Sequence, residues 1–263
     1  MDTNLDIAIK ASIAAGEAIM EIYQKAFNVE LKADNSPLTE ADKKANDIIN
    51  DLLLKTDIPI ISEENREVAF STRKKWTLCW MVDPLDGTKE FIKRNGEFTV
   101  NIALIEGGTP ILGVIYVPEK RILYYAKVEE GQAFKVKIEE TRVSCEELYE
   151  ASEQITPEKG NEEKIKVVGS RSHMNEETKR YIASLKSENK EIEIVSRGSS
   201  LKFCLVAEGL ATVYPRYAPT MEWDTAAGQA ICNAVGVDVI SLETQEPLIY
   251  NKENLLNSWF ICK

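Results

Sequence analysis

Two aspartates in the sequence Asp-Pro-Leu-Asp-Gly-Thr, at residues 83–88, are spaced to bind a metal ion. An apolar run before them predicts a strand that ends at this turn. Proline fixes one backbone angle there, and glycine allows a conformation that side chains forbid. The turn would bring the Asp83 and Asp86 carboxylates toward the Leu85 carbonyl oxygen and the Thr88 hydroxyl. Such oxygen ligands suit a hard cation such as magnesium, although an ordinary type I or II turn uses the same residue types.

Two further acidic sites lie far away in the chain. Glu63 and Glu64 follow a short apolar run that predicts a strand, and Asp224 precedes a segment that predicts a helix ending near Gly236. Paired glutamates are also common in solvated loops, and an aspartate before a helix is a common N-cap. If these positions meet in space, Glu63, Asp83, Asp86 and Asp224 would repel one another without cations. Two or three magnesium ions would neutralise them and support two-metal phosphoester hydrolysis.

Asp42 has two compatible interpretations. It lies three residues after Thr39, which matches a capping box at the start of a helix running to about Lys55. It is also a candidate partner for Thr88 beside the metal-binding turn.

A phosphate site is predicted near residues 198–200, where Gly-Ser-Ser opens a helix that runs to about Glu208. Backbone amides at a helix start, beside serines and Lys202, favour a phosphate group. A serine there is equally an ordinary N-cap.

The rest of the chain predicts the elements that position these residues. A core helix is expected at residues 3–24, and short turns between apolar strands at residues 98–138 indicate an antiparallel meander. Residues 139–164 are rich in Glu and Lys and read as a link with room for one short helix. Beyond them, strands alternate with helices, which is typical of an α/β layer arrangement. We therefore expect an N-terminal α+β half (1–140), a charged link (141–164) and a C-terminal α/β half (165–263).

Composition narrows the class of protein. The 263 residues suit one large domain or two modest ones, and a net charge of −11 argues against non-specific binding to a nucleic-acid polymer. Five irregularly spaced cysteines favour buried reduced thiols over disulfides or zinc. No signal peptide and no apolar run near the ~20 residues of a membrane span are found, so the sequence predicts a cytoplasmic protein. Peripheral association with the inner membrane and the oligomeric state stay open.

Three motifs in this order resemble the inositol monophosphatase superfamily, a group of lithium-sensitive, magnesium-dependent phosphatases. They are Ser-Glu-Glu at 62–64, the turn at 83–88 and Trp-Asp-Thr-Ala-Ala-Gly at 223–228. Longer stretches are similar to the bacterial CysQ-type 3'(2'),5'-bisphosphate nucleotidases of sulfur metabolism: residues 32–37, 87–91, 170–173, 198–204 and 214–216. The resemblance implies hydrolysis of adenosine 3',5'-bisphosphate (PAP) to AMP and phosphate. It also implies a layered αβαβα sandwich with an antiparallel N-terminal sheet.

The resemblance further implies roles for individual residues. Glu63, Asp83 and the Leu85 carbonyl would hold one magnesium ion, and Asp83, Asp86 and Asp224 a second. Thr88, oriented by Asp42, would position and help deprotonate the attacking water. The implied substrate-binding residues are Glu63, Leu85, Asp86, Gly87, Thr88, His173, Ser199, Lys202, Arg216 and Asp224.

Other interpretations remain at this point. His173 also suits a structural histidine, and Arg216 a surface arginine. An inositol or sugar phosphatase of the same superfamily would share the metal motif, and a non-catalytic nucleotide or metal sensor would share the fold.

Overall fold

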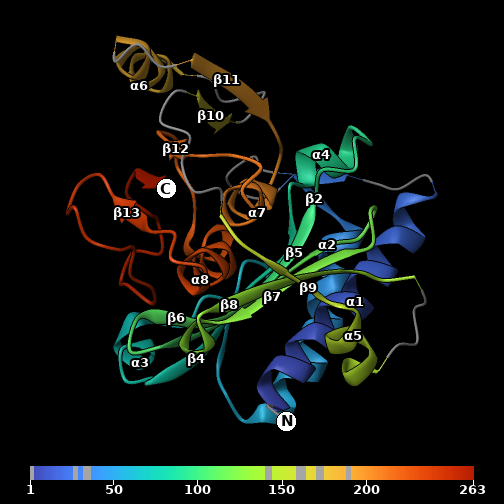
Figure 1. Cartoon of the computed structure of the whole chain (residues 1–263). Coiled ribbons are helices and arrows are strands. Elements are labelled where there is room, and N and C mark those ends of the chain that lie inside the picture. The colour runs from blue at the N-terminus through green and yellow to red at the C-terminus, as the bar shows by residue number, and fades with distance from the viewer. Residues whose placement is uncertain are drawn as a thin grey trace.

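The computed structural model describes residues 3–25, 29–31, 37–139, 144–157, 164–169, 175–187 and 191–263 (Figure 1). Two of the sequence stretches that carry the family resemblance are wholly or mostly missing from these described ranges. Residues 32–36 and 170–173, the latter with His173, lie outside the described residues.

A seven-stranded sheet forms the centre of the N-terminal half, in the order β3-β4-β5-β6-β7-β8-β9. Strand β3 pairs with β4 in parallel, and every other pair is antiparallel. The predicted meander is therefore confirmed. The strands are β3 (Ile60–Ser62), β4 (Leu78–Asp86), β5 (Thr99–Glu106), β6 (Thr109–Val117), β7 (Ile122–Lys127), β8 (Gln132–Lys137) and β9 (Glu153–Ile155).

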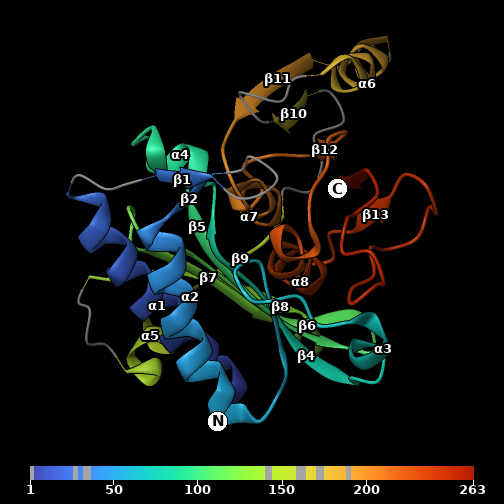
Figure 2. The same cartoon turned by 180° about the vertical axis from the view of Figure 1, so that it is seen from behind.

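Helices cover both faces of this sheet. Helices α1 (Thr3–Tyr23) and α2 (Glu40–Leu53) pack on one face, and α7 (Leu201–Ala207) and α8 (Ala226–Ala234) on the other (Figures 1 and 2). Side chains alternate along a strand, so Trp80 and Val82 of β4 join the core under α1 and α2, whereas Cys79 and Met81 join the core under α7 and α8. Strand β4 thus separates two apolar cores.

Helix α8 approaches the sheet closely at Gly113 of β6. A Cβ atom there would lie 2.4 Å from the carbonyl oxygen of Ala227, so only glycine fits. This contact fixes the distance between the sheet and the helix that follows Asp224.

The C-terminal half adds two small sheets. Strands β10 (Lys164–Gly169) and β11 (Glu191–Ser196) pair in parallel beside α6 (Glu176–Ser187). Strands β12 (Tyr214–Arg216), β14 (Phe260–Cys262) and β13 (Val239–Ser241) form an antiparallel sheet. Strand β12 includes Pro215 and Arg216, because this segment pairs with β14. The layers follow the order α1 and α2, the seven-stranded sheet, α7 and α8, the β10–β11 sheet, and α6. This order confirms the expected αβαβα sandwich.

The stretch treated above as a charged link has structure of its own. Helix α5 (Cys145–Ala151) buries Cys145 and Leu148 against the core under α1, and β9 adds the edge strand beside β8. Both belong with the N-terminal sheet, so we propose that the two halves divide after β9.

The short elements α3 (Phe70–Arg73), α4 (Thr88–Ile92), β1 (Val29–Leu31) and β2 (Pro37–Thr39) complete the described chain, with 3-10 turns at Leu54–Thr56, Val128–Glu130 and Glu222–Asp224. All five cysteines are buried free thiols, as the sequence indicated. Among the helices that the structure describes, none combines the length and the apolar character needed to cross a bilayer.

Candidate active site

Three carboxylates meet at one point of the structure. Asp83, Asp86 and Asp224 each present one oxygen, and these oxygens all lie within 4.8 Å of one another. Asp83 and Asp86 end β4, where the pairing with β5 shifts register between them. Asp224 ends the 3-10 turn before α8. Positions that are more than 130 residues apart in the chain therefore converge, as the sequence analysis expected.

Burial and repulsion raise the pKa of two of these carboxyls. Burial raises the pKa of Asp83 well above its usual value, and the charges of Glu63, Asp86 and Asp224 raise it further. Burial likewise raises the pKa of Asp224 to about 8, with added repulsion from Asp86 and Glu63. Glu63, just beyond β3, is thus close enough to act on both. A divalent cation would relieve this repulsion, and oxygen-only donors suit magnesium.

Backbone groups orient two of the carboxylates. The Leu85 N–H donates to Asp83 Oδ1 at 3.0 Å, and the Met221 N–H donates to Asp224 Oδ2 at 2.8 Å. Thr225, and not Asp224, occupies the N-cap position of α8. The alternative interpretation of Asp224 as the cap of that helix is wrong.

Asp42 makes both of the contacts that the sequence allowed. Its Oδ2 accepts hydrogen bonds from the backbone N–H (2.8 Å) and the hydroxyl (2.6 Å) of Thr39, which completes the capping box of α2. Its Oδ1 accepts a hydrogen bond from the Thr88 hydroxyl at 3.1 Å. The same hydroxyl lies 3.4 Å from the Leu85 carbonyl oxygen. Gly87, at the N-cap of α4, has φ +94°, a conformation that favours glycine.

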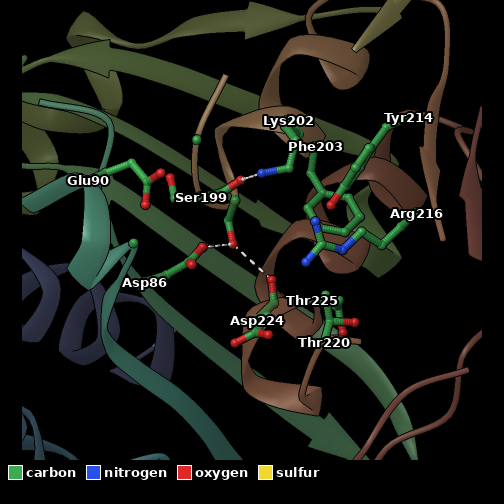
Figure 3. A pocket seen from close by; sticks show the side chains of 13 residues that line it. Asp86, Glu90, Ser199, Lys202, Phe203, Tyr214, Arg216, Thr220, Asp224 and Thr225 are labelled. Carbon is green, nitrogen blue, oxygen red and sulfur yellow. Dashed lines mark hydrogen bonds between the residues drawn. The ribbon is translucent and has the colours of Figure 1, made fainter. Parts of the chain in front are cut away.

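A cavity of about 110 Å³ opens beside the carboxylates. Figure 3 shows Asp86 and Glu90 on one side of it and Lys202, Tyr214 and Arg216 on the other. The two sides come from different halves of the chain. Most of the residues expected to bind substrate line this cavity, namely Asp86, Gly87, Ser199, Lys202, Arg216 and Asp224. Glu63, Leu85 and Thr88 do not line it, and His173 lies outside the described residues.

Lys202 is a buried cation, with only 5% of its surface exposed. Its ammonium donates to the Ser199 carbonyl oxygen and lies 5.4 Å from the centre of the Tyr214 ring. Burial lowers the pKa of Lys202 to about 8, opposed chiefly by the negative charge of Asp86. The side chain is therefore mostly charged at neutral pH.

Two buried polar atoms at the cavity lack a partner within the described part of the chain. They are the Ser199 hydroxyl oxygen and Nε of Arg216. Buried polar groups are rarely left without a hydrogen bond, so these atoms are available to a polar ligand.

Ser200 and Asn101 contribute contacts that sequence reasoning missed. The Ser200 hydroxyl lies 2.7 Å from Asp86 Oδ2 and 2.8 Å from the Asp224 carbonyl oxygen, and it accepts a hydrogen bond from the Asn101 amide at 2.8 Å. Ser200 holds the N-cap position of α7 without a side-chain cap bond. The sequence signal that could have revealed this contact is Asn101 itself, a polar side chain within the apolar run of β5.

Comparisons with known proteins agree over nearly the full chain. Residues 1–259 match the family model described as the inositol monophosphatase family. A relative in Shigella flexneri, named 3'(2'),5'-bisphosphate nucleotidase CysQ, is 47% identical over 261 residues, covering 97% of this chain and 98% of the relative. A CysQ from Haemophilus influenzae is 34% identical, covering 94% of this chain and 87% of its own.

Solved structures show the same fold. The crystal structure of CysQ from Bacteroides thetaiotaomicron, described as a bacterial member of the inositol monophosphatase family, superimposes with a TM-score of 0.89. It is 49% identical and covers 100% of this chain and 97% of that one. An IMPase from Thermotoga maritima gives a TM-score of 0.76 at 26% identity, with 100% and 92% coverage. Sequence and structure together show that the chain belongs to the inositol monophosphatase family.

Proposed function

We propose that this protein is a magnesium-dependent 3'(2'),5'-bisphosphate nucleotidase. It removes the 3'-phosphate of PAP to give AMP and phosphate, and it also acts on 3'-phosphoadenosine 5'-phosphosulfate. The observation that carries this proposal is the convergence of Asp83, Asp86 and Asp224 beside a cavity that holds the cations Lys202 and Arg216. Full-length relatives that bear the nucleotidase name support it.

The donor set fits two or three Mg²⁺ ions, because every donor is an oxygen and buried carboxylates repel one another without cations. Glu63, Asp83 and the Leu85 carbonyl would hold one ion, and Asp83, Asp86 and Asp224 another. Bound Mg²⁺ supplies charge that makes a water molecule acidic and stabilises the leaving oxygen. We also propose that lithium inhibits the enzyme, as the resemblance to the lithium-sensitive superfamily implies.

The Thr88 hydroxyl is the group that orients the attacking water. Its proton is directed to Asp42 Oδ1, which leaves a lone pair of Thr88 Oγ1 free to accept a proton from water. The backbone amides of Gly87 and Thr88, at the start of α4, would contact the scissile phosphate. Asp42 is in turn fixed by Thr39, so the acceptor cannot turn away.

The second phosphate and the nucleoside occupy the cavity between the two halves. Lys202 and Arg216 supply positive charge, and the Ser199 hydroxyl supplies a hydrogen bond. His173 is assigned to this region by resemblance alone. The buried reduced thiols favour a reducing compartment, so we place the enzyme in the cytoplasm.

A phosphate-release assay tests the proposal. Purified protein with magnesium should release phosphate from PAP with a higher kcat/KM than from inositol 1-phosphate or a sugar phosphate. Asp83→Ala should abolish release, since it removes a ligand shared by both ions. A preference for inositol 1-phosphate would assign a different member of the family, and nucleotide binding without turnover would indicate a sensor.

A further inference from the structure

We propose that Glu97 is a positioning residue that sets the preference for nucleotide bisphosphates over simple phosphomonoesters. It does so by holding the recognition loop, defined as residues 197–200, against the phosphate-binding turn at residues 86–88. The inference rests on the proposed function, because it assigns recognition of the second phosphate and nucleoside to this loop.

Glu97 reaches from one half of the chain to the other. It lies just before β5 and is only 7% exposed. Its Oε2 accepts a hydrogen bond from the backbone N–H of Gly198 at 2.9 Å, and its Oε1 lies 3.9 Å from the Arg197 guanidinium. The Glu97 N–H itself donates to the Asn95 side chain at 2.9 Å. A buried carboxylate that accepts a backbone N–H is a strong, directional tether.

The backbone of Glu97 is also wedged between two glycines. A Cβ atom on Gly198 would lie 2.9 Å from the Glu97 carbonyl oxygen, and one on Gly87 would lie 3.1 Å from the same oxygen. The same Cβ atom on Gly87 would lie 3.4 Å from Cβ of Ser199. Glu97 therefore packs against the recognition loop and the phosphate-binding turn at once.

The recognition loop has a conformation that needs support. Ser199 has φ +46°, in the left-handed region that residues with a side chain rarely adopt. In this conformation the Ser199 carbonyl oxygen accepts a hydrogen bond from the Lys202 ammonium. The buried Ser199 hydroxyl has no hydrogen-bond partner in the described part of the chain. Ser200 ties the other end of the loop to Asp86 at 2.7 Å. Glu97 and Ser200 thus hold the loop from both sides of Ser199.

These contacts predict a selective effect on substrates. A simple phosphomonoester uses only the metal ligands and the turn at residues 86–88. PAP also uses Ser199 and Lys202, whose positions depend on the loop. Removing the hydrogen bond that holds the Gly198 end of the recognition loop should therefore weaken PAP binding more than it slows hydrolysis of glycerol 2-phosphate.

The experiment compares Glu97→Ala with Glu97→Gln in the full-length enzyme. Loss of a hydrogen bond to a charged group predicts about a tenfold rise in KM for PAP in Glu97→Ala, with kcat/KM for glycerol 2-phosphate falling less than about threefold. The glutamine side chain still accepts the Gly198 N–H, so Glu97→Gln should restore the wild-type KM. Hydrogen exchange, followed by mass spectrometry on peptides spanning residues 196–203, should be faster in Glu97→Ala only.

Glu208→Ala is the matched control, because Glu208 is similarly buried and bonded to Lys135 at 2.6 Å but does not line the cavity. Unchanged exchange in Glu97→Ala would refute the tether. Equal losses for both substrates, or the same KM shift in Glu208→Ala, would reduce Glu97 to a general stabilising residue. A wild-type enzyme that prefers inositol 1-phosphate would overturn the proposed function, while the exchange data would still decide whether Glu97 holds the loop.

Discussion

Asp224→Asn should stabilise the metal-free protein although it removes a predicted metal ligand. Asp83, Asp86 and Asp224 present oxygens within 4.8 Å of one another. Burial, together with repulsion from Asp86 and Glu63, raises the pKa of Asp224 to about 8. Asparagine keeps an oxygen that can accept the Met221 N–H, which donates to Asp224 at 2.8 Å. The substitution therefore removes the charge and keeps the local hydrogen bond.

The magnitude follows from the difference in pKa between the folded and unfolded states. In the unfolded chain the pKa of the Asp224 carboxyl is near its ordinary value of 3.8, whereas in the folded protein this pKa is about 8. At pH 7 the folded protein must hold a proton that the unfolded chain has released, which costs about 4 kcal/mol at most. Asp224 is half-buried, so water screens part of this cost and about 2–4 kcal/mol remains. At roughly 2 °C per kcal/mol for a chain of this length, the Tm should rise by about 4–8 °C.

The assay is thermal unfolding in excess EDTA between pH 4 and pH 9. Between about pH 4 and pH 8 the folded state keeps the Asp224 proton and the unfolded state loses it, so the wild-type free energy of unfolding should fall as pH rises. The Asp224→Asn protein should show a shallower slope. Adding magnesium should raise the Tm of the wild type more than that of the variant, which keeps the proposed ligands Glu63, Asp83 and Leu85 of the other ion.

The exposed Asp47 on α2 offers a control, and Asp47→Asn should leave the Tm within about 1 °C because exposed substitutions change stability little. A metal-free Asp224→Asn protein that melts at or below the wild-type temperature would refute the reasoning. That result would mean that folding does not raise the pKa of Asp224 by burial and repulsion as inferred.

Three other predictions concern catalysis, recognition and packing. Asp42→Asn should lower kcat on PAP by about 100-fold, because the amide oxygen can still accept a hydrogen bond from Thr88 but cannot take up a proton; an unchanged kcat would exclude that role. The KM of the wild type for PAP should rise above about pH 8 as Lys202 loses its proton. Lys202→Met should raise KM at all pH values and remove that dependence; a retained dependence would point to another group. Gly113→Ala should lower the free energy of unfolding in urea by about 1–3 kcal/mol, because its Cβ would lie 2.4 Å from the Ala227 carbonyl, and a neutral result would show that α8 can move away.

Local sequence patterns were enough to place most helices and strands. Spacing of three and four predicted α1, and alternation with short turns predicted the meander of β5 to β8. The capping box at Thr39 and Asp42 was readable because both partners lie within one helical turn. The edge strand β9 was missed, since a three-residue strand in charged surroundings has no periodicity of its own and depends on pairing with β8.

The sequence by itself determined the donor chemistry of the site: four acidic residues, each beside an apolar segment or a helix start, in motifs that resemble one phosphatase family. Only the tertiary structure decided which of these groups meet and what holds them. The bonds from Ser200 to Asp86 and from Glu97 to Gly198 join residues about 100 positions apart. Such contacts depend on how the two halves pack, and local propensity carries no information about packing between distant segments.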